Sequence, residues 1–394
     1  MKKCLLLLPR PVFPLVCGYA LKNYNLIRIL ASHYELQLVI LSDHGLKAEE
    51  QEYYKSLGVS VLVHRIPKWR SYLQALMGLF SSQPLQVCYY YDHSLQRRLL
   101  PLLSTNDVLI AALVRTREYL KPAETMPGKT IVFDMVDSIA LNYMRSGTKT
   151  ASVFWKLVYG IEGKRLLRYE RRSVENSSVT YLFNPQEQNY WKGFGHVVRL
   201  PHGVNEELFH YEKRDPKWEH AVVFIGKMDY QPNVDAAVWY MQKVHSVIGK
   251  EIPLVIVGAY PSEKVLSCAR SLPNVTVTGF VEDPYLYVHS AMAVVAPMQT
   301  GGGIQNKVLE GMALGKVNLI STLAAKPIAG ARDGEHFLIA DTPEEYVGLL
   351  RKIAAKPENY AEIGKHARTL IKEEYSWKCY GERYLEEIRE SEKN

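Results

Sequence analysis

The sequence lacks the features of a membrane-spanning, disulfide-linked or repetitive protein. No apolar run among its 394 residues reaches the ~18 residues that a spanning helix needs. The cysteines number only five and form no CxxC pair, which favours free thiols in a reducing compartment over a disulfide framework. No period recurs along the chain, which argues against a solenoid. We therefore expect a cytoplasmic globular protein.

Motifs for metal ions and nucleic acids are also missing. No Asp-x-Asp pair stands near the end of an expected strand, and no spaced cluster of His and Cys occurs. Basic residues are plentiful, but no aromatic-studded basic groove or known binding motif accompanies them. We expect no metal, no other cofactor and no nucleic-acid partner.

The first residues, MKKCLLLLPRPVF, imitate a signal peptide. The apolar run stops at Pro9-Arg10, however, which is too short for a hydrophobic signal region. Val16 before Cys17 also makes a poor lipoprotein cleavage site. We expect this segment to be a buried first strand.

The composition is that of an ordinary globular protein, with 47% hydrophobic and 23% charged residues. The length exceeds one comfortable core, so two domains are expected. The charge is uneven: residues 1–200 carry a net charge of +11, and the remainder carries −4. A basic half suggests contact with something anionic.

Short β-branched apolar runs alternate with helix-length segments in both halves. The runs expected as strands are KCLLLL, ELQLVILS, VSVLVHRI, DVLIAALV, TIVFDMV and VTYLFN in the first half, and HAVVFIG, PLVIVG, VTVTGFV, AVVAP and VNLIS in the second. Near-continuous apolar strands separated by helices indicate parallel sheets covered on both faces. The fold class is therefore α/β, with two facing doubly wound, Rossmann-like domains and a cleft between them, because ligands bind beyond the carboxyl ends of such strands. We expect a first domain over 1–203, a second domain over 204–375, and a final helix over 376–394 that packs back across the first domain.

The segment MQTGGGIQNKVLEGMALGK, Met298 to Lys316, predicts a ligand site. We expect AVVAP to be a strand, MQTGGG a turn and IQNKVLEGMALG a helix that begins at Ile304. Bare backbone N–H groups in the turn and the helix dipole would attract a phosphate. Lys307 in the first helical turn can reach the same anion, and Glu310 one turn later suits ribose hydroxyls. A simple tight turn is the alternative interpretation. An unpaired carboxylate on an otherwise apolar helix face favours the ligand site for Glu310.

This segment resembles the donor domain of family 4 glycosyltransferases of the GT-B fold, and bacterial polysaccharide or exopolysaccharide sugar transferases in particular. The resemblance extends in order over nearly the whole chain, through CGYALKNYNLIRILA, GKRLLRYERRSV, LPHGVN, VVFIGKMDYQPNVDAAVWYM, PLVIVG and GFVEDPYLYVHSAMAVVAP. It implies a nucleotide-sugar transferase that retains the anomeric configuration and needs no metal. The resemblance also implies that residues 1–203 bind the acceptor, that residues 204–375 bind the nucleotide-sugar donor, and that the last helix crosses back to the N-terminal domain.

The resemblance assigns site residues by position. Lys227 and Lys307 would neutralise the departing diphosphate, and Asp137 would face the sugar as a third catalytic residue. The donor-binding positions are Gly18, Lys22, His202, Gly203, Gly303, Ile304, Gln305, Asn306 and Glu310. Other interpretations stay open for three of them: Lys22 could lie on a solvated face, Asp137 could cap the following turn, and His202 could be a loop residue without a ligand.

Two departures from the family pattern matter. The usual first acid, eight positions before Glu310, is replaced by Gly302, which leaves Gln305 and Asn306 as candidates to face the sugar. Where the family often has a second basic residue, this chain has Pro232-Asn233. Lys307 is expected to take over that phosphate contact.

The helix GKRLLRYERRSVEN is unusually basic. A plain solvated face is the default interpretation. The net charge of this half also suits peripheral contact with an anionic membrane or a lipid diphosphate, through Lys164, Arg165, Arg168, Arg171 and Arg172.

We therefore predict a cytoplasmic, peripherally membrane-associated glycosyltransferase of the polysaccharide-synthesis type. It would move a sugar from a nucleotide sugar to a hydroxyl of a lipid-linked or glycan acceptor. A non-catalytic GT-B scaffold or regulatory subunit and a sugar-nucleotide epimerase are the alternatives. The absent first acid at position 302 is the main support for the scaffold.

Overall fold

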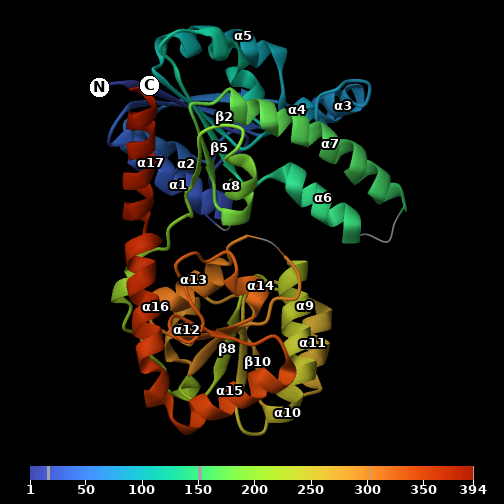
Figure 1. Ribbon diagram of the computed structural model, residues 1–394, viewed down its shortest axis with the longest axis vertical. Helices are drawn as coiled ribbons and strands as arrows, with labels where there is room; N and C mark the ends of the chain where they lie inside the picture. Colours follow the sequence, from blue (N-terminus) through green and yellow to red (C-terminus); the bar gives the residue numbers. More distant parts are fainter. Residues whose placement is uncertain (16–17, 150–152, 302, 394) are drawn as a thin grey trace. The chain divides into compact units, whose positions relative to one another are not determined.

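The computed structural model describes residues 1–15, 18–149, 153–301 and 303–393. It divides into two units (Figure 1): unit 1 comprises Met1–Pro201 and Gly381–Asn394, and unit 2 comprises His202–Tyr380. Each unit is described by itself. Cys17 and Gly302, on which two expectations rest, lie outside the described residues.

Unit 1 is built on a seven-stranded sheet in which every recorded pair is parallel, in the order β3-β2-β1-β4-β5-β6-β7. The segment predicted as a first strand is β1 at its centre, with Leu5 to Leu8 at most 1% exposed. Burial on both faces explains why this strand reads as an unbroken apolar run. The strands are β1 Lys3–Leu8, β2 Glu35–Ser42, β3 Ser60–Arg65, β4 Val108–Ala112, β5 Thr130–Val136, β6 Val179–Leu182 and β7 Val197–Arg199.

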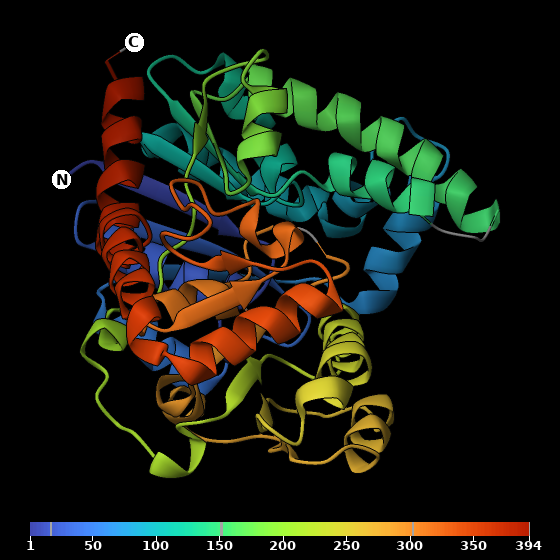
Figure 2. The same ribbon diagram turned by 60° about the horizontal axis from the view of Figure 1, so that its bottom comes forward.

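Helices cover both faces of this sheet, with α1 and α2 on one face and α5 on the other (Figure 1). Helices α6 and α7 lie side by side as a long hairpin in both views (Figure 1 and Figure 2). The end of α17 also belongs to unit 1, where the Tyr384 ring stacks on Tyr181 with centroids 4.3 Å apart. The helices are α1 Gly18–Ala31, α2 Ala48–Ser56, α3 Lys68–Gly78, α4 Leu85–Tyr90, α5 His93–Thr105, η1 Arg117–Thr125, α6 Ile139–Lys149, α7 Val153–Glu175, α8 Pro185–Trp191 and the end of α17 Trp377–Ser391.

Unit 2 repeats the plan with a six-stranded parallel sheet in the order β10-β9-β8-β11-β12-β13. Its strands are β8 Val222–Ile225, β9 Leu254–Val257, β10 Val275–Val277, β11 Ala293–Ala296, β12 Val317–Ile320 and β13 Leu338–Ile339. Its helices are η2 Glu206–His210, η3 Pro216–Trp218, α9 Gln231–Tyr240, η4 Met241–His245, α10 Ser246–Ile248, α11 Glu263–Arg270, α12 Pro284–Ser290, α13 Asn306–Ala313, α14 Thr322–Ala325, α15 Pro343–Ala355, η5 Pro357–Tyr360, α16 Ala361–Glu374 and the start of α17.

The predicted α/β class with two parallel doubly wound sheets is confirmed. Most apolar runs became strands with bounds within two residues of those expected, and β1, β2 and β5 match at both ends. The strands β7 and β13 were not predicted. They are only three and two residues long, and such short edge strands leave no periodic signal in a sequence.

Both sheets reverse their strand order once, and this determines where a ligand site is expected. The reversal lies between β1 and β4 in unit 1 and between β8 and β11 in unit 2. Loops after two such neighbouring strands diverge to opposite faces and leave a crevice at the carboxyl edge. Most predicted site residues lie in or beside these loops, whereas Asp137 follows β5, and His202 and Gly203 follow β7.

Cys4, Cys88, Cys268 and Cys379 are all free thiols. Over the described residues, no helix combines the length and apolar character needed to cross a membrane.

Candidate functional site

The strongest candidate site lies at the strand reversal of unit 2. Strands β8 and β11 are hydrogen-bonded neighbours, so the loops that leave their carboxyl ends start side by side. The loop after β8 carries Lys227, and the loop after β11 is the glycine-rich turn that leads into α13. These two loops come from sequence positions about 70 residues apart, yet the parallel sheet brings them to one edge.

The glycines of the turn are required by its backbone conformation, and the turn is also a candidate ligand-binding site. Gly301 and Gly303 have φ angles of 108° and 76°, which L-residues with side chains rarely adopt. Helix α13 then begins at Asn306, two residues later than the predicted helix, with Gln305 as its N-cap. The Gln305 side chain makes no capping hydrogen bond. The start of α13 is therefore not satisfied by a cap side chain.

Lys307 is buried in this turn, with 8% of its surface exposed. Its Nζ donates to Oδ1 of Asn233, lies 3.6 Å from the Met298 sulfur and sits 4.9 Å from the centre of the Phe224 ring. Burial lowers the pKa of the ammonium to about 8, and the nearby Glu310 carboxylate opposes the shift. A desolvated cation held by a neutral amide is well suited to receive an anion.

Asn233, noted from the sequence only as a departure from the family pattern, is the residue that holds Lys307. Its Nδ2 donates to the Lys227 carbonyl oxygen at 2.9 Å, so one side chain joins the β8 loop to α13. A Cβ added at Gly226 would lie 2.7 Å from this amide nitrogen and 3.4 Å from the lysine Nζ. Glycine at position 226 is therefore needed for the amide and the ammonium to fit together.

Glu310 lies one turn after Lys307 on α13 and is partly buried. Burial raises the pKa of its carboxyl to about 6, against the opposing effects of the Tyr285 hydrogen bond and of Lys307. The Tyr285 hydroxyl comes from α12 and was missed in the sequence, although it lies within the segment that carries the family resemblance. The carboxylate keeps acceptor capacity for hydroxyl groups of a ligand.

Lys227 differs from Lys307 in its surroundings. Its side chain is 57% exposed and forms an ion pair with Asp229 at 3.1 Å. Its ammonium also lies 5.2 Å from the centre of the Tyr260 ring. Ile304, Gln305 and Asn306 stand at the start of α13, each partly buried. The roles assigned to these residues remain predictions.

Lys22 in unit 1 is buried and ion-paired rather than on a solvated face, and its assignment to the nucleotide-sugar donor remains a prediction. It lies in α1 with only 2% of its surface exposed, and its Nζ forms an ion pair with Oδ2 of Asp134 on β5, which is fully buried. The Tyr384 hydroxyl donates to the same oxygen at 3.4 Å. The four-residue spacing from Gly18 placed Lys22 one helical turn into α1 correctly, but only the packing shows that its charge is already neutralised.

Asp137 directly follows β5, as predicted, and its surroundings are unusual. Val136 before it has a φ of 68°, a costly conformation for a β-branched residue. Ser138 after it is buried, donating through its hydroxyl to Glu170 and through its backbone N–H to Glu187. Burial raises the pKa of Glu170 to about 8. The end of β5 is thus a strained, carboxylate-supported segment next to α6. Gly18, the first residue of α1, is exposed at the same carboxyl edge.

His202 and Gly203 have structural roles in unit 2. The His202 ring is 8% exposed and stacks on Trp377, with centroids 6.2 Å apart. A Cβ at Gly203 would lie 2.4 Å from the Trp377 nitrogen, so glycine allows this segment to approach the start of α17. The contacts with Trp377 explain why His202 and Gly203 stand at these positions without invoking a ligand. Their assignment to the binding of the nucleotide-sugar donor remains a prediction.

A cavity of about 200 Å³ lies at the carboxyl ends of β1, β2 and β3 in unit 1. It is lined by Arg10, Asp43, Lys68, Ser71, Tyr89 and other side chains. Arg10 also stacks over the Tyr19 ring at 4.3 Å and was not singled out from the sequence. A lone arginine in a proline-rich loop gives no sequence signal.

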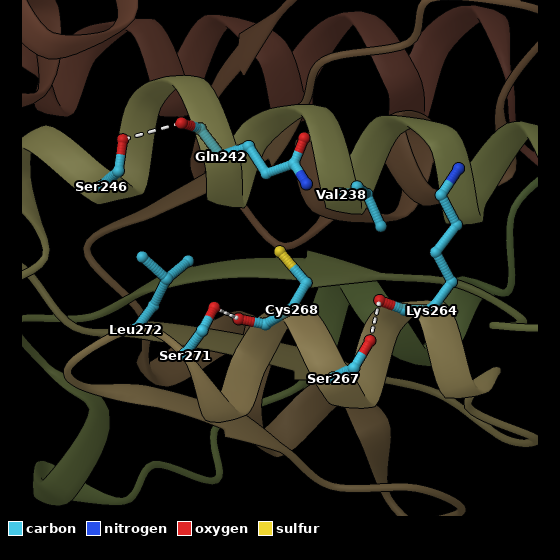
Figure 3. Close-up of a pocket in the computed structure, with 8 residues that line it drawn as sticks. All are labelled: Val238, Gln242, Ser246, Lys264, Ser267, Cys268, Ser271 and Leu272. Atoms are coloured by element: carbon cyan, nitrogen blue, oxygen red, sulfur yellow. Dashed lines mark hydrogen bonds between the residues drawn. The ribbon is translucent and has the colours of Figure 1, made fainter.

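A larger groove of about 400 Å³ lies between α9–η4 and α11 in unit 2 (Figure 3). Its hydroxyl groups are already satisfied within their own helices: Ser246 donates to Gln242, Ser267 to Lys264 and Ser271 to Cys268. The hydrogen bonds that these three hydroxyls donate are therefore already made within the helices. In the part of the chain that the structure describes, no three His, Cys, Asp or Glu side chains gather as metal ligands would.

Comparison with known proteins gives a family and a fold. Residues 219–356 match the family described as Glycosyl transferases group 1. A Klebsiella pneumoniae protein described as an uncharacterized 44.6 kDa protein in cps region is 24% identical over 238 residues. That match covers 58% of this chain and spans 60% of the relative's length.

Solved structures resemble the whole chain at low identity. Anabaena HepE in complex with UDP aligns with a TM-score of 0.69 and 11% identity, covering 99% of this chain and 100% of that one. TarM aligns with a TM-score of 0.68 and 10% identity, covering 98% and 99%. Sucrose-phosphate synthase from Thermosynechococcus elongatus gives 0.64 and 14%, covering 99% of each chain.

These likenesses define the fold class: two parallel α/β units in the GT-B arrangement of secondary structure. The matched region covers nearly all of the α/β core of unit 2, including the β8 loop and α13. Residues 219–356 thus match the glycosyltransferase group 1 family, and the whole chain shares the fold of these solved structures, in agreement with the sequence resemblance.

Proposed function

We propose that the protein is a retaining, metal-independent glycosyltransferase that moves a sugar from a nucleotide sugar to a hydroxyl of a lipid-linked or glycan acceptor. The observation that carries the proposal is the buried Lys307, held by Asn233 at the strand reversal beside the glycine-rich turn and Glu310. A relative encoded in a cps region supports a role in surface polysaccharide synthesis.

The donor half of the proposal follows from charge. The nucleotide diphosphate would lie against the turn at the start of α13, within reach of Lys307 and Lys227. Glu310 would accept hydrogen bonds from the ribose hydroxyls. Because preorganised cations in a desolvated site stabilise growing negative charge without reorganising, they are usually the largest catalytic contribution.

The transfer step needs no protein nucleophile. The bond between the sugar C1 and the diphosphate oxygen breaks, and the acceptor oxygen bonds to C1 on the same face. The acceptor's proton goes to the departing phosphate oxygen. The electron pair of the broken bond stays on the diphosphate, where Lys307, Lys227 and the helix dipole of α13 stabilise it.

A thermal-shift screen tests the donor assignment. UDP, GDP, dTDP, CDP and ADP and their sugars are compared, starting with UDP because HepE was solved with it. A ligand at 100 times its Kd adds about 2.7 kcal/mol to the folded state, which raises Tm by several degrees. The shift should disappear in Glu310→Gln. No shift with any nucleotide would favour the scaffold alternative.

Lys307→Met tests the catalytic role against a matched control. Lys316 in the same unit is also a largely buried lysine whose pKa burial lowers to about 8, but its Nζ donates to the His289 carbonyl. We expect Lys307→Met to lower kcat about 100- to 1000-fold, the effect of losing one oxyanion-type donor. Lys316→Met should change kcat less than threefold. Equal losses in the two variants would show a structural effect and contradict the assignment.

A further inference from the structure

Helix α3 of unit 1 presents its apolar side chains to solvent. They are spaced as i, i+3, i+4, i+7, i+8 and i+11, which places them on one face of a helix. The exposed fractions range from 46% at Leu73 to 68% at Trp69 within α3 and 92% at Phe80 just beyond it. We call this surface the α3 stripe; its members are Trp69, Tyr72, Leu73, Leu76, Met77 and Phe80.

The face of α3 that packs inward is small and polar. Ser71 and Gly78 are its buried residues. A Cβ at Gly78 would lie 2.7 Å from the Cys88 sulfur of α4, so the close contact depends on glycine. Arg165 of α7 donates to the Leu79 carbonyl oxygen at 2.9 Å and to that of Gly78 at 3.4 Å. The orientation of α3 is thus fixed by the packing of its inward face and by the Arg165 guanidinium at its carboxyl end.

A surface helix usually buries its apolar face and exposes its polar face, whereas α3 exposes its apolar face. Contiguous apolar patches of this kind mark interaction surfaces on soluble proteins. The stripe contains both Trp and Tyr, whose apolar rings and polar tips suit the boundary between lipid and water.

The basic residues of α7 beside the α3 stripe indicate which kind of partner would cover it. Arg165 joins the end of α3 to α7, where Lys164 and Arg168 are exposed. Arg165 pairs with the buried Glu162 at 3.7 Å, whereas the exposed guanidinium of Arg168 donates to the Lys164 carbonyl oxygen of its own helix. A second copy docked two-fold on this face would bring like charges together, whereas an anionic surface would complement them.

The inward face of α3 leads to a polar cavity. Lys68 and Ser71 line the cavity of about 200 Å³ at the carboxyl ends of β1, β2 and β3, together with Arg10. Asp43 also lines the cavity and pairs with Lys68 at 3.0 Å, so one short helix separates an exposed apolar surface from a polar, charged pocket. A surface embedded among acyl chains would place that pocket at the depth of lipid head groups.

We infer that the α3 stripe docks into the interfacial region of an anionic lipid bilayer, with the basic residues of α7 at the head groups. Docking by itself is independent of the proposed function. That it presents the pocket beside α3 to the head group of a lipid-linked acceptor rests on the proposed function.

Flotation with vesicles tests the docking. The purified full chain is mixed with vesicles of phosphatidylcholine alone or with equal phosphatidylglycerol, at low and high salt. We expect at least tenfold stronger partitioning to the anionic vesicles, reduced by salt. Leu76→Glu should lower the partitioning at least tenfold. The matched control is Val247→Glu in unit 2, because Val247 and Leu76 are both 57% exposed; it should change partitioning less than twofold.

Light scattering and the nucleotide thermal shift distinguish docking on a membrane from dimer formation and from failure of the donor assignment. Light scattering measures the mass of wild type and Leu76→Glu, and a dimer that becomes a monomer in the variant would show that a second copy covers the stripe. Equal flotation of wild type, Leu76→Glu and Val247→Glu, or no flotation at all, would also overturn the inference. The nucleotide thermal shift should be unchanged in Leu76→Glu, so failure of the donor assignment and failure of docking are seen in different measurements.

Discussion

The two units each bury a lysine in a helix that follows a strand at the reversal of the sheet, but the lysines have different partners. Lys22 on α1 meets the carboxylate of Asp134, and both side chains are almost fully removed from solvent. Lys307 on α13 meets the neutral amide of Asn233. Over the described residues, no carboxylate lies within ion-pair distance of Lys307; Glu310 acts on it only from further away.

This difference separates a structural cation from a ligand-ready one. An ammonium paired with a buried carboxylate has its charge compensated and gains nothing from a phosphate. Burial lowers the pKa of both ammonium groups, but only the one beside an amide has lost water without a carboxylate at ion-pair distance. A bound diphosphate would supply the missing charge, so unit 2 is the one prepared for an anion.

The largest expected effect is on the ion pair of unit 1. Asp134→Asn leaves Lys22 buried without a counter-charge, which should cost about 3–5 kcal/mol of unfolding free energy. Chemical denaturation measures the loss. The double variant Lys22→Met/Asp134→Leu should recover most of it, because both charges are then absent. A cost below about 1 kcal/mol for Asp134→Asn would show that the pair is solvated and would break the comparison.

Asn233→Asp makes the lysine of unit 2 resemble that of unit 1. The new carboxylate would pair with Lys307 and compete with the phosphate, and we expect nucleotide affinity to fall about tenfold to a hundredfold, the value of a charged hydrogen bond of roughly 1.5–3 kcal/mol. Calorimetric titration measures the affinity, and Tm is measured beside it because the variant also loses the hydrogen bond from Asn233 Nδ2 to the Lys227 carbonyl oxygen. Gln231→Glu, two residues earlier at an exposed position of α9, adds the same charge as a control and should change affinity less than threefold. Unchanged affinity in Asn233→Asp would mean that Lys307 does not contact the ligand.

The pKa values predict a pH window for nucleotide-sugar binding. The raised pKa of Glu310, about 6, means that its carboxylate is lost as pH falls below 6. The lowered pKa of Lys307, about 8, means that its charge is lost as pH rises above 8. Affinity should therefore be highest between these values and fall about tenfold within one pH unit beyond each limit.

Matched variants assign the two limits. Glu310→Gln should lower the affinity overall and remove the acid limb, and Lys307→Arg should extend the alkaline plateau because a guanidinium stays charged. A flat profile from pH 5 to 9 in the wild type would contradict both assignments.

Much of the architecture could be read from the sequence because parallel strands have a local signature. The runs KCLLLL, ELQLVILS and TIVFDMV became β1, β2 and β5 without a shift, since strands buried on both faces are apolar throughout. The start of α13 was expected two residues too early, because the glycines that define the turn also continue the helical spacing. The site was readable in part for a similar reason: Lys307 and Glu310 belong to one local segment.

The sequence by itself determined the two α/β sheets, the glycine-rich turn and the identity of the charged residues near it, because each depends on neighbours within about ten positions. Tertiary structure alone decided what those charges do. Asp134 neutralises Lys22 across 112 residues, whereas Asn233 holds Lys307 across 74 and leaves its charge uncompensated. Tertiary packing also turned the apolar face of α3 outward. In each case the role of a buried charge or an exposed apolar surface depends on neighbouring groups, which come into contact only when the chain folds.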